Sequence, residues 1–150
     1  MSTQASYEFS ESTKYGGFWI RVLANLIDGI VLLIPKLLIS FLLEATSHAE
    51  NEISLNITVF IWTLLFYWVY YAGLQSSAWQ ATVGKKAVGL KVIDENGNRI
   101  SFGRATGRHF ASYISTVIFC IGYMMVGWTS RKQGLHDMIA GTLVVYDQNA

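Results

Sequence analysis

The chain has 150 residues, of which 52% are hydrophobic, 14% aromatic and only 14% charged. Soluble domains carry about 25% charged residues, so this composition excludes an ordinary soluble domain and is typical of a membrane protein. The net charge of +1 comes without a basic stripe interleaved with aromatic residues, so no nucleic-acid partner is expected.

The chain begins with a polar tail over residues 1–15, and residues 16–147 are expected to form a single membrane domain. The first apolar run is longer than that of a signal peptide and lacks a small-residue cleavage site, so we expect it to be retained. The only cysteine, Cys120, lies inside an apolar run. A disulfide within the chain is therefore excluded.

Three apolar stretches predict three membrane helices, over about residues 18–43, 57–74 and 104–128. Each approaches the roughly 20 helical residues that cross a hydrocarbon core of about 30 Å. Because lipid offers no hydrogen bonds to the backbone, runs of this length are expected to be helical. The sequence thus predicts an all-α membrane protein, with a kink permitted at Pro35 in the first helix.

The charges between these stretches predict the orientation of the chain. The loop between the first two stretches holds three glutamates and no lysine or arginine. The segment 75–108 holds six basic residues: Lys85, Lys86, Lys91, Arg99, Arg104 and Arg108. Because basic loops stay in the cytoplasm, this segment and the N-terminus are expected to be cytoplasmic. The sequence therefore predicts a multi-pass protein of the cell (inner) membrane.

The third stretch allows two topologies. If residues 104–128 cross the membrane as one helix, Arg131 and Lys132 lie outside, against the charge rule. If the helix breaks near Gly122 and a short return helix follows, Arg131 comes back to the cytoplasmic side. We favour the return helix, which also places the C-terminus in the cytoplasm.

The segment before the third stretch is typical of β-structure. In residues 88–102, apolar residues flank Asn96-Gly97, a dipeptide preferred in tight hairpin turns. The sequence predicts a small cytoplasmic β-hairpin here. The β-branched tail GTLVVYD adds a third strand if the C-terminus is also cytoplasmic.

A second cytoplasmic feature lies just before this hairpin. The segment SSAWQATVGKKAVG combines aromatic and apolar residues with Lys85 and Lys86, a pattern typical of segments that lie on a membrane surface. We expect Lys85, Lys86 and, further along the chain, Lys91 to contact anionic lipid headgroups.

The second predicted helix is rich in aromatic residues toward its cytoplasmic end: Trp62, Tyr67, Trp68, Tyr70 and Tyr71. We interpret them as an interfacial belt, in which amphipathic rings lie at the level of the headgroups. The alternative is an aromatic cage for a cationic ligand.

The first predicted helix carries a polar face. Arg21, Asn25 and Asp28 are spaced four and three residues apart, so they fall on one side of the helix. Asp28 lies about 10 Å further along the axis than Arg21, close to the middle of the membrane. An aspartate there costs about 2.5–3.5 kcal/mol, so it is expected to meet a partner, a cavity or a bound cation.

Asn25 stands between the other two and is placed to relay hydrogen bonds from Arg21 to Asp28, which would make the polar face one network. Two interpretations follow. In the first, the network is a buried ion pair that fixes how the helices dock. In the second, it binds and moves a proton, an ion or a solute. The spacing does not separate them.

A second acidic residue occurs in the stretch RKQGLHDMIAGT. Asp137 follows Gly134 and His136 and precedes apolar residues, so it either caps a short helix or points into the helix bundle. His136 adds a group that titrates near neutrality, or else it packs or caps.

Other kinds of site have little support in the sequence. The three histidines, His48, His109 and His136, lack metal-ligand spacing, so no metal site is expected. A phosphate loop ending at Gly84 is excluded because Trp79 stands where its first glycine would be. No serine or cysteine has an evident catalytic base, so no catalytic residue and no cofactor are expected, and an enzyme is the least supported class.

Together these motifs resemble the RDD family of small bacterial membrane proteins, which is named for one arginine and two aspartates. The resemblance rests on the charged residues of the first helix, on TVGKKAVGLKV before a strand and a turn, and on a late GLHD before AGTLVV. It extends from about Gly16 to Asp147, nearly the whole chain.

The resemblance implies that the three residues of the family name are Arg21, Asp28 and Asp137. If they meet, the cluster holds one positive charge and two carboxylates, which leaves one surplus negative charge. In a low-dielectric site a surplus carboxylate is expected to take up a proton or hold a cation. His136 is then a candidate modulator of this cluster.

The resemblance implies several functions: transport is commonly suggested, sodium/proton exchange has been proposed for some members, and assistance to membrane assemblies for others. We therefore expect a transporter of a small solute or an ion, sodium/proton or otherwise proton-coupled, that uses Arg21, Asn25, Asp28, His136 and Asp137. Because so few helices enclose little volume, transport is expected to require a homo-oligomer. The alternative is a membrane adaptor or assembly factor in which the cluster is structural.

Overall fold

The computed structural model describes residues 13–46, 52–117 and 121–147. The predicted polar tail up to residue 12, together with His48 and Cys120, lies outside the described residues. The fold is mostly helical, with one small antiparallel sheet.

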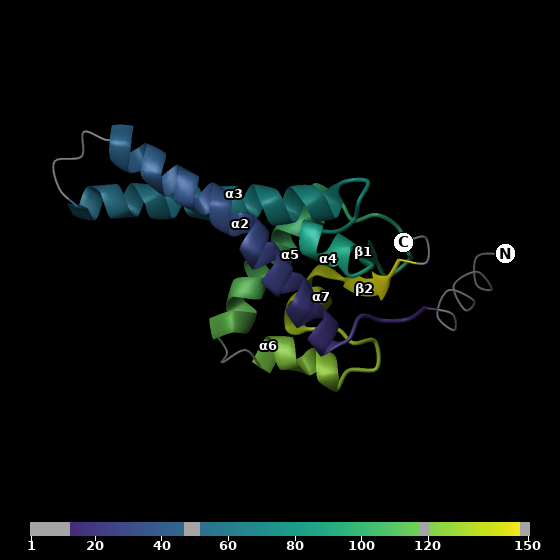
Figure 1. The fold of residues 1–150 in the computed structure, drawn as a ribbon. Coiled ribbons are helices and arrows are strands. Elements are labelled where there is room, and N and C mark those ends of the chain that lie inside the picture. The colour runs from purple at the N-terminus through teal and green to yellow at the C-terminus, as the bar shows by residue number, and fades with distance from the viewer. Residues whose placement is uncertain (1–12, 47–51, 118–120, 148–150) are drawn as a thin grey trace.

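Two long helices form an arm that projects from the rest of the molecule (Figure 1). Helix α2 spans Phe18–Thr46 and helix α3 spans Glu52–Ser76. They extend the predicted helices 18–43 and 57–74, and α2 continues as a helix through Pro35. Over Phe18–Ala45 and Glu52–Ser76, both are long and apolar enough to cross a membrane.

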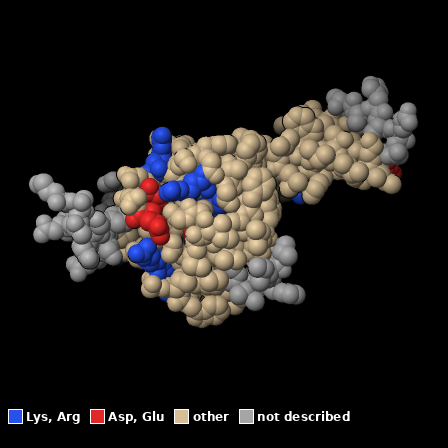
Figure 2. Space-filling view, turned by 180° about the vertical axis from the view of Figure 1, so that it is seen from behind, with Lys and Arg blue, Asp and Glu red and all other residues tan. Residues whose placement is uncertain are grey.

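The surface of the arm is apolar. Within the described residues 33–45 and 52–71 no side chain is buried, and Ile34 and Phe60 are 73% and 62% exposed. Figure 2 shows that the arm has few charged side chains, whereas lysine, arginine and acidic residues gather over the compact end. An exposed apolar surface of this size is what lipid tails cover in a membrane protein.

The third predicted span does not form one long helix. Helix α5 covers only Phe102–Val117, and the chain re-enters helix at α6 (Ile121–Met124), followed by the 3₁₀ turn η1 (Met125–Gly127). The hydroxyl of Tyr123 lies 3.4 Å from the carbonyl oxygen of Ser112, so α6 folds back along α5. Three membrane helices are therefore not confirmed: α5 ends at Val117, and Gly122, where a break was expected, lies within α6.

The sheet pairs segments that lie far apart in the sequence. Strand β1 (Leu90–Asp94) is antiparallel to strand β2 (Thr142–Tyr146), with Leu90 opposite Tyr146 and Asp94 opposite Thr142. On the other side of β2, Tyr15 forms an isolated bridge with Val145. Chain segments from the start, the middle and the end of the domain thus meet at one place (Figure 1).

The predicted hairpin over residues 88–102 is wrong in its second half. The turn at Asn96-Gly97 does form, and it is closed by a hydrogen bond in which the Asp94 backbone N–H donates to the Asn98 carbonyl oxygen at 2.9 Å. No second strand follows, since Ile100 is buried in the core and Phe102 begins α5. Strand β2 takes the place beside β1, because four of its five residues bury their side chains.

The main core lies between this sheet and the helices. Its buried residues are Ala72, Leu90, Val92, Ile100, Ala105 and Val144, which come from α3, β1, the turn, α5 and β2. This core holds α3 and α5 in fixed positions against the sheet.

Two short helices complete the compact end. Helix α4 (Val83–Ala87) packs on α2, and helix α7 (Leu135–Ala140) packs on α5. Gly141 follows α7 with a φ of 59°, a left-handed conformation that glycine adopts without strain, and this lets the chain enter β2 at once. The two helices bring Lys85 and Asp137 to the space between α2 and α5.

Candidate functional site

Asp137 is the centre of a buried ion cluster. It lies in the first turn of α7 with no solvent exposure. Arg21 from α2 donates to its Oδ2, and Arg108 from α5 donates to its Oδ1 with Nε at 2.8 Å and Nη2 at 2.6 Å. One carboxylate therefore binds two guanidinium groups, and we call these three residues the Asp137 cluster.

The two arginines tie further elements to this cluster. Arg21 Nε donates to the carbonyl oxygen of Gly16 at 2.8 Å, and its Nη2 donates to that of Lys132. Arg108 Nη1 donates to the side-chain oxygen of Gln75 on α3. The cluster thus connects α2, α3, α5 and α7.

The cluster keeps Asp137 ionised. Burial by itself would raise the pKa of Asp137, but Arg108 and Arg21 outweigh it and hold the pKa well below its usual range. The backbone N–H of Gly134 also donates to Asp137 Oδ2 at 3.1 Å. Asp137 therefore both supports the start of α7 and points into the bundle, which combines the two roles that the sequence left open.

Arg108 was not among the site residues predicted from the sequence. It shares one face of α5 with Ala105, Ala111 and Ser115, and all four are buried. A stripe of small residues at helical spacing that contains a single arginine is a signal of a buried guanidinium. We missed this signal because we used Arg108 only as one of the basic residues of a cytoplasmic segment.

Asp28 lies in a separate cluster. It is fully buried and accepts three hydrogen bonds, from the Tyr70 hydroxyl at 2.7 Å, the Thr82 hydroxyl at 2.6 Å and the Gly84 backbone N–H at 2.7 Å. In the described part of the chain, no hydrogen bond joins Asp28 to Arg21. The structure thus attaches Asp28 to α3 and α4 rather than to the Asp137 cluster.

Gly84 allows α4 to lie close to Asp28 on α2. A Cβ atom at Gly84 would lie 2.0 Å from the Ala24 carbonyl oxygen and 2.9 Å from Asp28 Cγ. Only glycine allows the α4 backbone to approach α2 so closely that its N–H reaches the carboxylate. The local sequence TVGKK therefore determines how Asp28 is satisfied.

Asn25 does not form the expected relay between Arg21 and Asp28. Its side chain is exposed and faces a cavity, and no hydrogen bond within the described residues connects it to either neighbour. The reason is that the two charged residues turn to different helices, Arg21 toward α7 and Asp28 toward α4.

His136 lies beside the Asp137 cluster, with Nε2 3.4 Å from Asp137 Oδ1. Burial lowers the pKa of His136 to about 4, because desolvation outweighs the attraction of Asp137. His136 is thus neutral near pH 7, which favours the packing role over titration near neutrality, the two alternatives that the sequence left open. Its buried Nδ1 has no hydrogen-bond partner in the described structure.

Lys85 does not lie on the membrane surface as expected. Only 5% of it is exposed, because α4 turns it inward between α2 and α5. Burial, and next the charge of Arg108, lower the pKa of Lys85 to about 7. Lys86 and Lys91 remain partly or fully exposed and pair with Asp147 at 3.7 Å and 3.2 Å, so their contact with headgroups stays a prediction.

These positions change the expected charge balance. Asp28 and Asp137 are matched by Arg21 and Arg108, and Lys85 adds a third cation. The surplus is therefore positive whenever Lys85 is protonated, and the predicted surplus of negative charge is wrong. Sequence spacing missed this because the two additional cations come from other helices.

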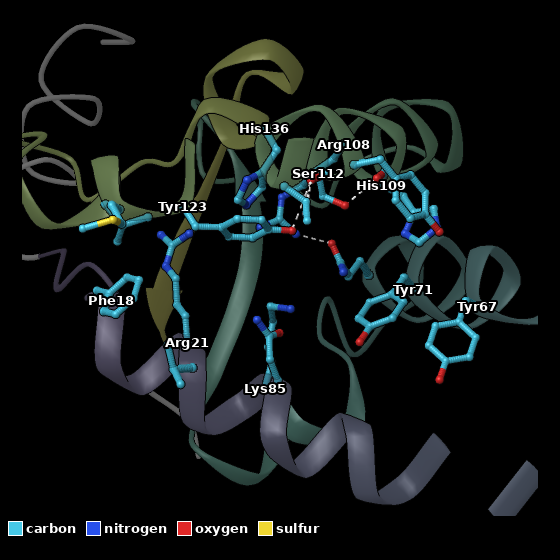
Figure 3. A pocket seen from close by; sticks show the side chains of 17 residues that line it. Phe18, Arg21, Tyr67, Tyr71, Lys85, Arg108, His109, Ser112, Tyr123 and His136 are labelled. Carbon is cyan, nitrogen blue, oxygen red and sulfur yellow. Dashed lines mark hydrogen bonds between the residues drawn. The ribbon is translucent and has the colours of Figure 1, made fainter. Parts of the chain in front are cut away.

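A cavity of about 640 Å³ lies next to the Asp137 cluster. Figure 3 shows Arg21 and Lys85 pointing into it from one side, opposite Arg108 and His136. Among the described residues, no aspartate or glutamate lines it. No group of three or more His, Cys, Asp or Glu residues in the described ranges could hold a metal ion.

Comparison with known proteins identifies the family. The model of the RDD family matches residues 15–141. The chain belongs to the RDD family. The resemblance seen in the sequence is thus confirmed, and together with the two apolar helices it makes this chain a membrane protein.

Relatives of this RDD-family protein occur in several bacteria. It is 39% identical to the uncharacterised protein YxaI of Bacillus subtilis (strain 168), over 89% of this chain and 98% of that protein. It is 28% identical to the uncharacterised membrane protein YteJ of the same strain, over 89% and 82% of the two chains. It is 31% identical to the proline-rich antigen of Mycobacterium leprae (strain TN), over 84% of this chain and 59% of that protein. No solved structure matches it significantly.

Proposed function

We propose that this RDD-family protein is a transporter of a small solute, and that the solute binds in the cavity between α2, α3, α5 and α7. The single observation that carries the proposal is the cavity itself, whose volume of about 640 Å³ is that of small-molecule sites. Its wall combines apolar and aromatic side chains with polar and charged groups, as solute sites do.

The geometry supports a small solute more than sodium/proton exchange on the two aspartates. Asp28 already accepts three hydrogen bonds, and Asp137 binds two guanidinium groups. A sodium ion needs free oxygen ligands, and neither carboxylate has a free face toward the cavity.

The adaptor alternative is favoured by one observation, the Asp137 cluster. It ties four helices together through buried contacts, as expected of a charge cluster whose role is structural. This role does not account for the cavity beside the cluster. A structural cluster and a neighbouring solute site are compatible, so we retain the transporter as the conclusion.

We infer in addition that α2 and α3 both cross the membrane, with residues 14–15, β1 and β2 in the cytoplasm. The contacts of β2 with Tyr15 and with β1 put these segments on one side, and the basic residues nearby favour the cytoplasmic side. In intact cells, cysteines introduced at Lys14 and Glu95 should stay unlabelled by an impermeant maleimide until the membrane is opened. Labelling of either one before opening would overturn this topology.

Transport is proposed to occur in a homo-oligomer. The mouth of the cavity has exposed residues, whereas its other end is closed by the Asp137 cluster. One protomer therefore offers a binding site, and a second copy would complete the passage.

Filling the cavity tests the transporter proposal. Ser112 lines the cavity from α5, and a phenylalanine there would occupy part of it. Proteoliposomes are given radiolabelled sodium, tetraethylammonium or benzenesulfonate. We expect the wild-type protein to take up at least one of them and Ser112→Phe to reduce that uptake about tenfold or more, since the site is blocked sterically.

The control is Ser130→Phe, the same substitution at an exposed position outside the cavity. It should leave uptake unchanged, and both variants should keep the melting temperature of the wild type to within a few degrees. The proposal fails if no probe enters faster than into empty liposomes, or if Ser112→Phe transports normally.

A further inference from the structure

The closed end of the cavity presents three cations. Arg21, Lys85 and Arg108 line it, and no carboxylate does so within the described residues. Asp137 stands behind the two arginines and Asp28 stands behind α4, so both acids are shielded from the cavity. A solute that enters therefore meets positive charge first.

Lys85 is the least satisfied of these cations. Among the described residues its Nζ forms no ion pair or hydrogen bond, and its neighbour is the ring of Tyr71, 5.9 Å from Nζ to the ring centroid. A buried ammonium without a directly paired counter-ion is costly, because the more distant charges of Asp28 and Asp137 do not outweigh desolvation. An anion in the cavity would supply this missing partner.

His136 provides a second, independent observation. Its Nδ1 is buried and unpartnered, although His136 lines the cavity and is only 6% exposed. Buried polar atoms in native proteins nearly always have a partner, so an orphan in a cavity wall indicates a missing group. Because Nε2 faces Asp137, the neutral ring carries its proton there, and Nδ1 would accept a hydrogen bond from an occupant of the cavity or from water held with it.

The open end of the cavity has a different character. Its residues are at least partly exposed and include Asn25, Tyr67, Tyr113, Thr116 and Met124. Asn25 belongs to α2 and Tyr67 to α3, so the mouth lies along the two helices that are expected in the bilayer. The rings of Tyr67 and Tyr113 and the side chain of Met124 offer apolar surface there, beside the polar groups of Asn25 and Thr116. A molecule with an anionic end and a mainly apolar body matches both ends of this cavity.

We propose that the cavity binds an anionic amphiphile, with its phosphate, sulfonate or carboxylate group at Lys85 and Arg108 and its apolar body along the mouth. This inference rests on the proposed function and names the class of solute. The anion could be a lipid of the membrane or a separate solute, and the two sources share this chemistry.

Binding at Lys85 is expected to be coupled to a proton. Several groups face Lys85: the cations Arg108 and Arg21, the acids Asp28 and Asp137, and the ring of Tyr71. The pKa of Lys85 is lowered to about 7, so in the empty protein a substantial fraction is neutral at physiological pH. An anion stabilises the charged form and raises this pKa, so the site takes up a proton as the anion binds.

The pH dependence follows from this direction. Below about pH 7 Lys85 is already charged, so affinity is at its full value. Above that pH the fraction of protein with a protonated Lys85 falls. The affinity for the anion falls with it, by a factor on the order of 30 between about pH 6 and about pH 8.5. Deprotonation of Lys85 is therefore expected to favour release of the anion.

The experiment uses the full chain in phosphatidylcholine nanodiscs and measures its melting temperature with added probe. Decanesulfonate is the main probe, because its charge stays −1 across this pH range. Methanesulfonate has the headgroup without the tail, and decyltrimethylammonium has the tail with the opposite charge. We expect decanesulfonate to raise the melting temperature, more at low pH than at high pH, and the other two to have much smaller effects, because a ligand of the folded state stabilises it.

Variants assign the effect to Lys85. Lys85→Met should weaken decanesulfonate binding about tenfold or more and abolish its pH dependence, whereas Lys85→Arg should keep binding at high pH, since arginine stays charged. The matched control is Lys14→Met, an exposed lysine that does not line the cavity. Equal binding by Lys85→Met and the wild type would overturn the proposal.

A further arm separates the two sources of the anion. If a membrane lipid is the occupant, nanodiscs with phosphatidylglycerol should raise the melting temperature and reduce the response to decanesulfonate, because the two compete. If the occupant is a separate solute, phosphatidylglycerol should leave the response to decanesulfonate unchanged. Either result is consistent with binding of an anionic amphiphile, and the difference between them identifies whether it comes from the membrane or from solution.

The outcomes also separate this inference from the proposed function. If only decyltrimethylammonium binds, and Ser112→Phe abolishes that binding, the class of solute is wrong while the cavity remains a solute site. If no probe binds and no probe is transported, both proposals fail together.

Discussion

Replacing Asp137 by asparagine is expected to destabilise the protein by about 3–5 kcal/mol, because two buried arginines lose their shared counter-charge. Arg21 and Arg108 are 8% and 5% exposed, so water compensates little for the lost carboxylate. A loss of this size is a large part of the 5–15 kcal/mol that typically stabilises a domain. We expect little folded Asp137→Asn protein in membranes and a strongly lowered melting temperature.

A surface ion pair provides the control for this variant. Arg131 and Glu95 are 3.4 Å apart, and both side chains are more than half exposed. Glu95→Gln should change the melting temperature little, because exposed pairs contribute at most about 1 kcal/mol. If Asp137→Asn were as mild as Glu95→Gln, the Asp137 cluster would not hold the helices together.

Combining Asp137→Asn with Arg108→Gln should be less harmful than the sum of the two single changes. The second substitution removes one of the cations that the first leaves without a partner, so the two effects are coupled. Strict additivity of the two losses in melting temperature would show that the arginines do not depend on Asp137.

Replacing Gly84 by alanine is the second change with a large expected effect. The new methyl group would lie 2.0 Å from the Ala24 carbonyl oxygen, an overlap that only movement of the α2 or α4 backbone can relieve. Such movement would also draw the Gly84 N–H away from Asp28, leaving a buried carboxylate with one donor fewer. We expect a loss of about 4 kcal/mol or more, in the range where single substitutions prevent folding.

Two other glycines provide matched controls for Gly84→Ala. Gly103 and Gly107 lie within α5, and a Cβ atom at either would meet nothing within 4 Å. Alanine at these positions should leave stability unchanged or raise it by up to about 1 kcal/mol, because alanine favours helix. Thermal melts of the three variants in the same detergent decide the matter, and a Gly84→Ala protein as stable as Gly103→Ala would refute the close contact of α2 and α4.

The two clusters give the family's charged residues separate roles. Asp28 fixes α4 against α2, and Asp137 fixes α7 against α2 and α5. Lys85 and Arg21 line the cavity on one side, opposite Arg108 (Figure 3). The clusters thus build the walls of the cavity, and the cation left unpaired within it is the group available to a ligand.

Much of the arm was predictable from the sequence. Apolar runs of this length have one low-energy conformation in lipid, so the two long helices followed from composition alone. The polar face of Arg21, Asn25 and Asp28 was also predictable, because helical spacing is a local property. The burial of Asp28 followed from the cost of exposing charge to lipid.

The partners of these residues could not be predicted in the same way. Strand β2 replaces the expected second strand of a hairpin because long-range burial of Leu143, Val144 and Val145 outweighs the local signal of the turn at Asn96-Gly97. Arg108 and Lys85 were assigned to a cytoplasmic surface by the positive-inside rule, which counts charges along the chain and does not record which helix face they occupy.

Local pattern therefore accounts for the membrane class, the two long helices, the family and the residues that carry charge in the first helix, since each depends on a few neighbouring positions or on composition. Packing between distant segments decided which acid meets which base, the sign of the surplus charge and the presence of a cavity. The physical reason is that electrostatic balance in a low-dielectric interior depends on distances between groups from different helices, and no spacing along one helix determines those distances.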